Sequence, residues 1–165
     1  MRAFPLRFPV TLCFAFALAA CSHGTSPPTT ATAATATTPG DAANDAIATS
    51  NGVTLRANVM ETRDLQESVA RGYGVAREPN QALLLLTVRD ANGDNATPVS
   101  LQATVSDLKG RERPLPLREI RVGEFVDHIA LAPVAAPDTL TFGIRAQLAP
   151  GSASTLRLSR DFYPR

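Results

Sequence analysis

Apolar and polar residues alternate along much of the chain beyond residue 52, and this pattern limits the possible folds more than any other feature. Residues 53–59, 99–105, 140–148 and 156–162 place apolar side chains at alternate positions. Successive side chains of a β-strand point to opposite faces, so a period of two is typical of strands with one buried face. Four such segments in one chain predict an all-β fold.

Three further segments complete the predicted set of strands. Residues 82–88 are apolar almost throughout, as in a central strand, and residues 115–121 and 124–131 are two more candidates. Turn signals punctuate these strands at Asn92-Gly93, Lys109-Gly110, Val122-Gly123, Pro137-Asp138 and Pro150-Gly151. We therefore predict an immunoglobulin-like antiparallel β-sandwich of about seven strands, with a small open barrel as the alternative. The sequence has no tryptophan and no pair of cysteines in this part, which excludes only an antibody-type core.

Residues 64–72 break the alternation and predict one short helix between the first two strands. Asp64 is a candidate N-terminal cap, and Leu65 and Val69 are spaced to share one helical face. Gly72 or Gly74 would end the helix.

The N-terminal residues have the composition of an export signal. Arg2 and Arg7 supply positive charge, and residues 8–20 form an uncharged run of about 13 residues, where a membrane-spanning helix needs about 20. The tetrad 18–21, Leu-Ala-Ala-Cys, resembles the lipobox of bacterial lipoprotein signal peptides. The resemblance implies cleavage before Cys21 and lipid on its thiol. An ordinary secretory signal cut nearby is the alternative.

These features divide the chain into residues 1–20 as a lipoprotein signal peptide, 21–51 as lipidated Cys21 with a linker, and 52–165 as the sandwich domain. The linker is rich in Thr, Ala and Pro and has too few large apolar side chains to offset its ordering entropy, so it is predicted to be disordered. It would act as a spacer, or else as a glycosylated or wall-contacting stalk. Ser22 resembles the sorting residue of lipoproteins placed in the outer membrane. We expect a lipid-anchored envelope protein facing the periplasm, with surface display left open.

Several classes of function find no support in the residues. The chain has 16 basic and 15 acidic residues and no basic run, which argues against nucleic-acid binding. The two histidines, His23 and His128, lack the spacing of a metal site, and His128 is expected to be an exposed strand residue. Asp127 would point to the opposite face of the same strand. No nucleophile elbow and no phosphate-binding loop is present, so no cofactor is expected.

Two polar clusters are candidate binding surfaces. The first, Tyr73, Arg77 and Asn80, follows the predicted helix. It would be either a loop pinned by hydrogen bonds to the backbone or a ligand surface. The second is Arg118, Glu119 and Arg121. In a strand Glu119 and Arg121 share a face, so this cluster would be either a surface ion pair of small energy or a recognition site.

The same parts of the chain carry a resemblance to a known family. The residues concerned are Leu65, 69–75, Arg77, Asn80, 83–88, 117–121 with Gly123, and 156–163. They resemble the domain of unknown function 4426 family over nearly all of residues 53–165. The family is one of exported proteins in Gram-negative bacteria, so the resemblance implies a compartment and no chemistry. This chain departs from it in its long Thr/Ala linker.

Two hypotheses of function follow. In the first, the protein is a non-catalytic binding or structural module, tethered to a membrane by lipid, whose partner is an envelope protein, the cell wall or a small ligand. Strand edges could recruit such a partner by strand addition. In the second, it is a small periplasmic enzyme or enzyme accessory with a polar site near Tyr73, Arg77 and Glu119.

Overall fold

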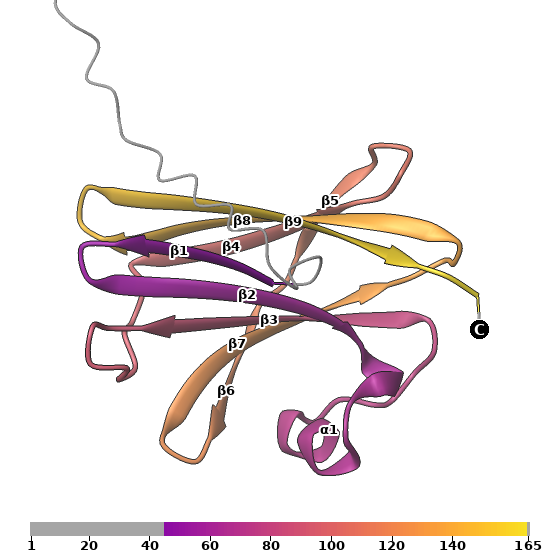
Figure 1. Cartoon of the computed structure of the whole chain (residues 1–165), viewed down its shortest axis with the longest axis horizontal. Coiled ribbons are helices and arrows are strands. Elements are labelled where there is room, and N and C mark those ends of the chain that lie inside the picture. Colours follow the sequence, from indigo (N-terminus) through magenta and orange to yellow (C-terminus); the bar gives the residue numbers. More distant parts are fainter. Residues whose placement is uncertain (1–44, 165) are drawn as a thin grey trace, which may run out of the picture. The chain divides into compact units, whose positions relative to one another are not determined.

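The computed structural model describes residues 45–164, which form two antiparallel β-sheets and one short α-helix (Figure 1). This confirms the predicted antiparallel β-sandwich. The signal peptide, Cys21 and the first part of the predicted linker lie outside the described residues. The elements are β1 (Asp45–Ser50), β2 (Val53–Glu61), the 3-10 turn η1 (Thr62–Asp64), α1 (Glu67–Tyr73), β3 (Gln81–Arg89), β4 (Ser100–Ser106), β5 (Glu112–Leu115), β6 (Arg118–Val122), β7 (Phe125–Pro133), β8 (Asp138–Ala149) and β9 (Ser152–Phe162).

The two sheets have five and four strands. The five-stranded sheet has the order β1-β2-β3-β7-β6, and the four-stranded sheet has the order β5-β4-β8-β9. The alternating residues of both sheets turn their apolar side chains toward each other. Leu55, Leu86, Phe142 and Ile144 lie in this core, where each has an exposed fraction of 0%. The remaining face of each sheet is left for the helix, for solvent or for a ligand.

Two strands replace the single strand predicted over 115–121. β5 ends at Leu115 in the four-stranded sheet, and β6 begins at Arg118 in the five-stranded sheet. Pro116 stands between them and has no N–H with which to continue a ladder. The chain therefore crosses from one sheet to the other at this point, and the prediction of one continuous strand was wrong.

The sandwich also begins earlier than the predicted boundary at residue 52. Strand β1 pairs with β2 in antiparallel register, and Ala48 on β1 is fully buried. Asn51 and Gly52 join the two strands with positive φ angles of 50° and 76°, as a two-residue hairpin turn requires. Residues 45–51 therefore belong to the domain and not to the linker. Strand β1 and the division of the predicted strand 115–121 into β5 and β6 raise the number of strands in residues 45–164 from the predicted seven to nine.

An arginine links the two sheets where β1 and β2 lie near β9. Arg160 occupies an inward position of β9, and its Nη1 donates a 2.6 Å hydrogen bond to the Val59 carbonyl oxygen of β2. The guanidinium lies 5.6 Å from the centre of the Phe162 ring. Ser50 and Ser152 add a 2.6 Å hydroxyl hydrogen bond between β1 and β9. Polar bonds thus join the sheet edges on this side of the sandwich.

Helix α1 covers part of the outer face of the five-stranded sheet. It lies between β2 and β3 as predicted, and Gly74 ends it in the left-handed conformation. Ala70 is its buried residue, and with Leu65 it packs on Leu83 and Ile129 of the sheet. The predicted cap was wrong, because Asp64 belongs to η1 and Gln66 is the N-cap residue.

The prediction that Leu65 and Val69 share one face of the helix was also wrong. Leu65 is buried but precedes the helix, and Val69 is 38% exposed. Within residues 45–164 no helix has the length and apolarity that a membrane crossing requires.

Candidate functional site

The structure places the first predicted cluster in separate contacts near α1. Arg77 donates a 2.8 Å hydrogen bond from Nη2 to the Arg63 carbonyl oxygen, which pins the loop after the helix to η1. The main-chain carbonyl of Asn80 accepts a 2.9 Å hydrogen bond from the Val134 N–H. The carbonyl of Tyr73 accepts a 2.9 Å hydrogen bond from Nη2 of Arg118, a residue of the second cluster. These contacts tie the loop after α1 to η1, to β6 and to the segment after β7.

The second cluster is divided between the two faces of β6. Glu119 and Arg121 form an exposed ion pair at 3.4 Å, as their shared face predicted. Arg118 lies opposite Ile129 and Glu119 lies opposite His128, so Arg118 and Glu119 point to opposite faces of the sheet. Glu119 is therefore directed away from the face on which Arg118 meets Tyr73. The structure does not gather Tyr73, Arg77 and Glu119 into one site.

A buried ion pair lies on the outer face of β3 and β7. Asp127 is 7% exposed and accepts a 2.7 Å hydrogen bond from Nη2 of Arg89. Nη1 of Arg89 donates 3.0 Å hydrogen bonds to the carbonyl oxygens of Val88 and Val126. The Phe125 ring lies 5.0 Å from the guanidinium carbon. Both terminal nitrogens of Arg89 and one carboxylate oxygen of Asp127 thus have partners within the fold, as expected of a structural ion pair.

His128 lies on the other face of β7 and is half-buried. Its Nδ1 is buried without a hydrogen-bond partner in the described part of the chain, which corrects the expectation of an exposed residue. Asp127 and His128 face opposite sides, as strand geometry predicts. Among residues 45–164 no three His, Cys, Asp or Glu side chains come together as a metal site.

Tyr73 gives this outer face a measurable pH response. Burial, and after it the charge of Asp127, raise the pKa of Tyr73 above its usual value. The neutral phenol is thus favoured in the folded state. Its contribution to stability is complete below the unfolded pKa of about 10 and is lost as pH rises through the folded pKa.

We expect Asp127→Asn to lower the pKa of Tyr73, because the negative charge near the phenol is removed. Tyrosinate absorbance in a Tyr163→Phe background, which leaves one tyrosine, measures it; an unchanged pKa would contradict the assigned charge effect.

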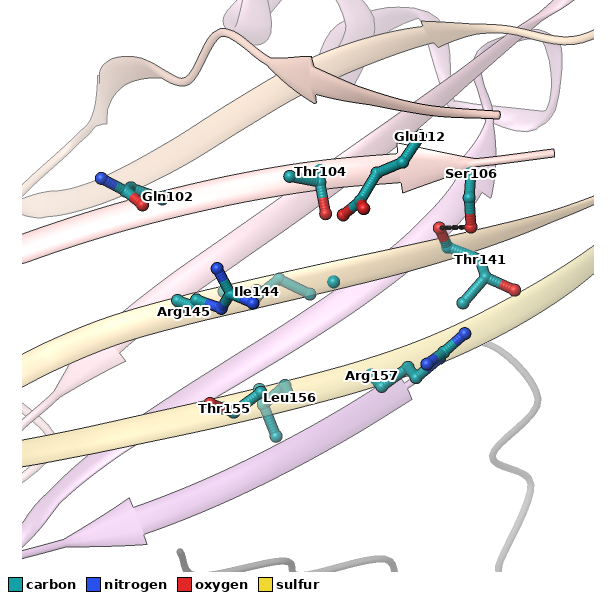
Figure 2. A pocket seen from close by; sticks show the side chains of 11 residues that line it. Gln102, Thr104, Ser106, Glu112, Thr141, Ile144, Arg145, Thr155, Leu156 and Arg157 are labelled. Carbon is teal, nitrogen blue, oxygen red and sulfur yellow. Dashed lines mark hydrogen bonds between the residues drawn. The ribbon is translucent and has the colours of Figure 1, made fainter. Parts of the chain in front are cut away.

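The outer face of the four-stranded sheet has a different character, because polar side chains cover it and a hollow opens in it. The hollow has a volume of about 290 Å³ and centres on β4, β8 and β9 (Figure 2). Hydroxyl and amide groups are common in its wall. The polar and charged residues of the lining are Gln102, Thr104, Ser106, Glu112, Thr141, Arg145, Thr155 and Arg157.

Gly143 forms the floor of the hollow. It lies between Thr104 of β4 and Arg157 of β9 in the register of the sheet, at an outward-facing position of β8. A Cβ atom at this position would come 2.9 Å from Oγ1 of Thr104. A side chain here would therefore occupy the hollow. Glycine in a strand interior costs roughly 0.5–1 kcal/mol relative to alanine, so the open space is kept against local stability.

Opposite charges stand at the two sides of the hollow. Figure 2 shows Glu112 beside Thr104 on the β4 side, and Arg145 and Arg157 on β8 and β9. All three charged side chains are exposed, and none of them has an ion pair or side-chain hydrogen bond within residues 45–164. By contrast, Arg56, Arg63, Arg71, Arg89, Arg111 and Arg121 each pair with a carboxylate. The hollow thus collects charged groups that the fold leaves available.

A second hollow of about 430 Å³ adjoins the first one along the sheet. The two share Gln102, Arg145 and Thr155 in their linings. Arg145 therefore stands between them, and an elongated ligand could lie across both.

Sequence reasoning missed this site. The alternation in 140–148 correctly predicts that Thr141, Gly143 and Arg145 lie on the outward face, but it does not indicate a ligand site there. A glycine inside a strand is a signal of close approach or of open space, and Gly143 carried that signal. Thr104, Glu112 and Arg157 come from three other strands, and only their pairing brings them to Gly143.

We expect the cost of keeping Gly143 to appear in a double-mutant cycle. In a Thr104→Ala background, where the clashing hydroxyl is gone, Gly143→Ala should raise the free energy of unfolding by about 0.5–1 kcal/mol. With Thr104 present the gain should be smaller, because the hydroxyl must move. Urea unfolding of the four proteins measures both effects. An equal gain in the two backgrounds would contradict the contact.

The comparisons with known proteins agree with this fold. A family described as "Domain of unknown function (DUF4426)" matches residues 48–165. The crystal structure of a DUF4426 family protein from Pseudomonas aeruginosa PAO1 is 20% identical, with a TM-score of 0.61 over 74% of this chain and 97% of that chain. At this identity the likeness shows the fold alone.

A weaker likeness connects the chain to a copper-bound variant of FetP from a uropathogenic strain of Escherichia coli. That protein is 9% identical, with a TM-score of 0.46 over 71% of this chain and 93% of that chain, which is too low to support an inference about function. A search among curated proteins finds no match.

Proposed function

Since the chain belongs to the DUF4426 family, whose function is unknown, we propose that it is a non-catalytic binding module of the bacterial cell envelope, held to a membrane by lipid on Cys21. Its ligand surface would be the outer face of the four-stranded sheet.

One observation carries the binding function: Glu112, Arg145 and Arg157 surround the hollow at Gly143 without partners among the described residues. A charged side chain with no partner in its own fold can form its full complement of hydrogen bonds with a ligand. A hollow lined by a few convergent polar groups is the usual form of a small-molecule site.

The chemistry of the lining favours binding over nucleophilic catalysis. A hydroxyl nucleophile needs a base within hydrogen-bond reach. The lining contains no histidine or cysteine. Among the described residues, none of the four lining hydroxyls, those of Thr104, Ser106, Thr141 and Thr155, is hydrogen-bonded to a carboxylate, and this includes Thr104, which lies beside Glu112.

The membrane tether is supported by the residues 18–21 and by the short apolar run before them. Two or more acyl chains hold a protein stably on a bilayer, and the linker would let the domain reach ligands away from it. Placement in the outer membrane, facing the periplasm, follows from the resemblance at Ser22. The Cys21→Ala variant should lose incorporated radiolabelled palmitate, while Cys13→Ala, in the cleaved segment, should keep it. Labelled Cys21→Ala would contradict the anchor.

The binding surface can be tested by photocrosslinking in intact envelopes. A photoreactive amino acid at Thr155, on the rim of the hollow, should give an adduct that disappears when Arg145 and Arg157 are both changed to Gln. The matched control is the same probe at Arg56, which is exposed on the outer face of the other sheet. No adduct at Thr155, or an equal adduct at Arg56, would count against the proposed surface.

A further inference from the structure

We propose that the hollow at Gly143 binds a short peptide with a free amino group and a free carboxylate, the carboxylate against Arg145 and Arg157 and the ammonium group against Glu112. This assignment rests on the binding function proposed above and names its ligand class.

The two arginines are placed to hold one carboxylate together. Arg157 lies directly opposite Gly143, and Arg145 is two residues farther along β8, so the arginines are diagonal neighbours in the sheet. Diagonal positions on paired strands are about 7–8 Å apart, well within the reach of two such long side chains. The guanidinium fork matches a carboxylate with two parallel hydrogen bonds. Two guanidinium groups on diagonal positions that have no carboxylate partner among residues 45–164 favour an anionic ligand group.

Glu112 decides what else the ligand must carry. Its carboxylate lines the same hollow and has no cationic partner among residues 45–164. A ligand with negative charge at both ends would bring one of them next to Glu112 and be repelled. A ligand with an ammonium group at that end would be attracted at both. The charges of the hollow therefore complement a zwitterion better than a polyanion.

The size of the sheet sets the length of this ligand. β5 and β9 are three strand spacings apart in the order β5-β4-β8-β9, which is about 14 Å between their backbones. The side chains of Glu112 and Arg157 both line the hollow and shorten this gap. An extended peptide spans roughly 3.3–3.6 Å per residue, so two or three residues bridge it. A volume of about 290 Å³ suits a molecule of that size.

The uncharged part of the lining provides space and hydrogen-bonding groups for a peptide backbone. Gly143 lets an extended chain approach the sheet closely, as a side chain at that position would not. Thr104, Thr155 and Gln102 present hydroxyl and amide groups that can donate to and accept from peptide groups. The side chains of these three residues have no hydrogen bond to other described residues.

The test is a nuclear magnetic resonance titration of the purified full-length chain with triglycine, N-acetyl-triglycine and triglycine amide. Triglycine carries both charges and no side chain, so binding reports the charges alone. We expect it to shift the backbone amide signals of Gly143, Thr104 and Arg157. Blocking either terminus should weaken binding about three- to tenfold, as should Glu112→Gln or the double change of Arg145 and Arg157 to Gln. Arg71→Gln, an exposed change on α1, is the control and should have no effect.

The pairing of each charge is tested by crossing probes with variants. Glu112→Gln should weaken triglycine binding and leave N-acetyl-triglycine binding unchanged, because the acetylated peptide has no ammonium group. Equal binding of the three peptides, or signal shifts confined to other surfaces, would overturn the assignment. If triglycine does not bind but the Thr155 crosslink still depends on Arg145 and Arg157, the peptide class is wrong and the binding function stands. Loss of both results removes both proposals.

Discussion

Replacing Phe142 by alanine should lower the free energy of unfolding by about 3–5 kcal/mol. Phe142 lies on β8 directly before Gly143 and points to the opposite face, into the core. Its exposed fraction is 0%, and it is among the largest fully buried side chains of the described domain. Removal of the ring loses its burial and leaves a cavity between two sheets that pack as rigid layers. Urea unfolding, followed by far-ultraviolet circular dichroism, measures the change.

A matched control comes from another phenylalanine of the sandwich. Phe125, on the outer face near the turn between β6 and β7, is 51% exposed and lies against the Arg89 guanidinium. Phe125→Ala should therefore cost no more than about 1 kcal/mol, the scale of an exposed cation–π contact. Equal losses for the two variants would mean that the core does not lie between the sheets.

Asp127→Ala should lower the free energy of unfolding by about 2–4 kcal/mol. The change removes the carboxylate that faces Arg89 at 2.7 Å and leaves the guanidinium half-buried without its counter-charge. The loss should fall below that of a fully buried pair, because Arg89 keeps its hydrogen bonds to the carbonyl oxygens of Val88 and Val126. Chemical denaturation of the single variants measures it.

Two further variants separate charge from packing. Asp127→Asn keeps an acceptor for Arg89 and should lose less than Asp127→Ala. Replacing the pair with apolar residues, as in Asp127→Leu with Arg89→Met, should recover much of the loss, because no buried charge is left. A double variant as unstable as Asp127→Ala alone would show that the pair contributes through its shape rather than its charges.

The predicted polar clusters show how much of a candidate site can be inferred from the spacing of residues in the sequence. The shared face of Glu119 and Arg121 follows from strand periodicity alone, and the 3.4 Å ion pair agrees with it. The contact between Arg118 and Tyr73 joins β6 to the end of α1, and no spacing in the sequence could reveal it. The division of Arg118 and Glu119 between two faces also follows from strand periodicity, and tertiary structure decided only which of the two faces meets α1.

The hollow at Gly143 shows the same limit more strongly. Glu112, Thr104, Gly143 and Arg157 lie on four strands, and each is an ordinary outward residue in its own segment. Their neighbours along the chain do not show which charges will lack a partner, since a charge can also pair across strands, as Arg56 does with Asp45 and Arg89 does with Asp127. Only Gly143 was a local signal. It could indicate an open position in the strand, but not which residues surround that position.

Local chemistry accounts for what could be inferred about the fold. Side-chain alternation in 53–59 and 140–148 indicates buried and exposed faces because it follows directly from the geometry of an extended backbone. The end of α1 at Gly74 could also be inferred from local sequence, because glycine adopts the left-handed conformation that ends a helix. The passage of the chain between sheets at Pro116, the pairing of β1 with β2, and the meeting of Arg145, Arg157 and Glu112 around one hollow were decided by tertiary structure. These depend on contacts between residues distant in sequence, whose energies no single segment contains.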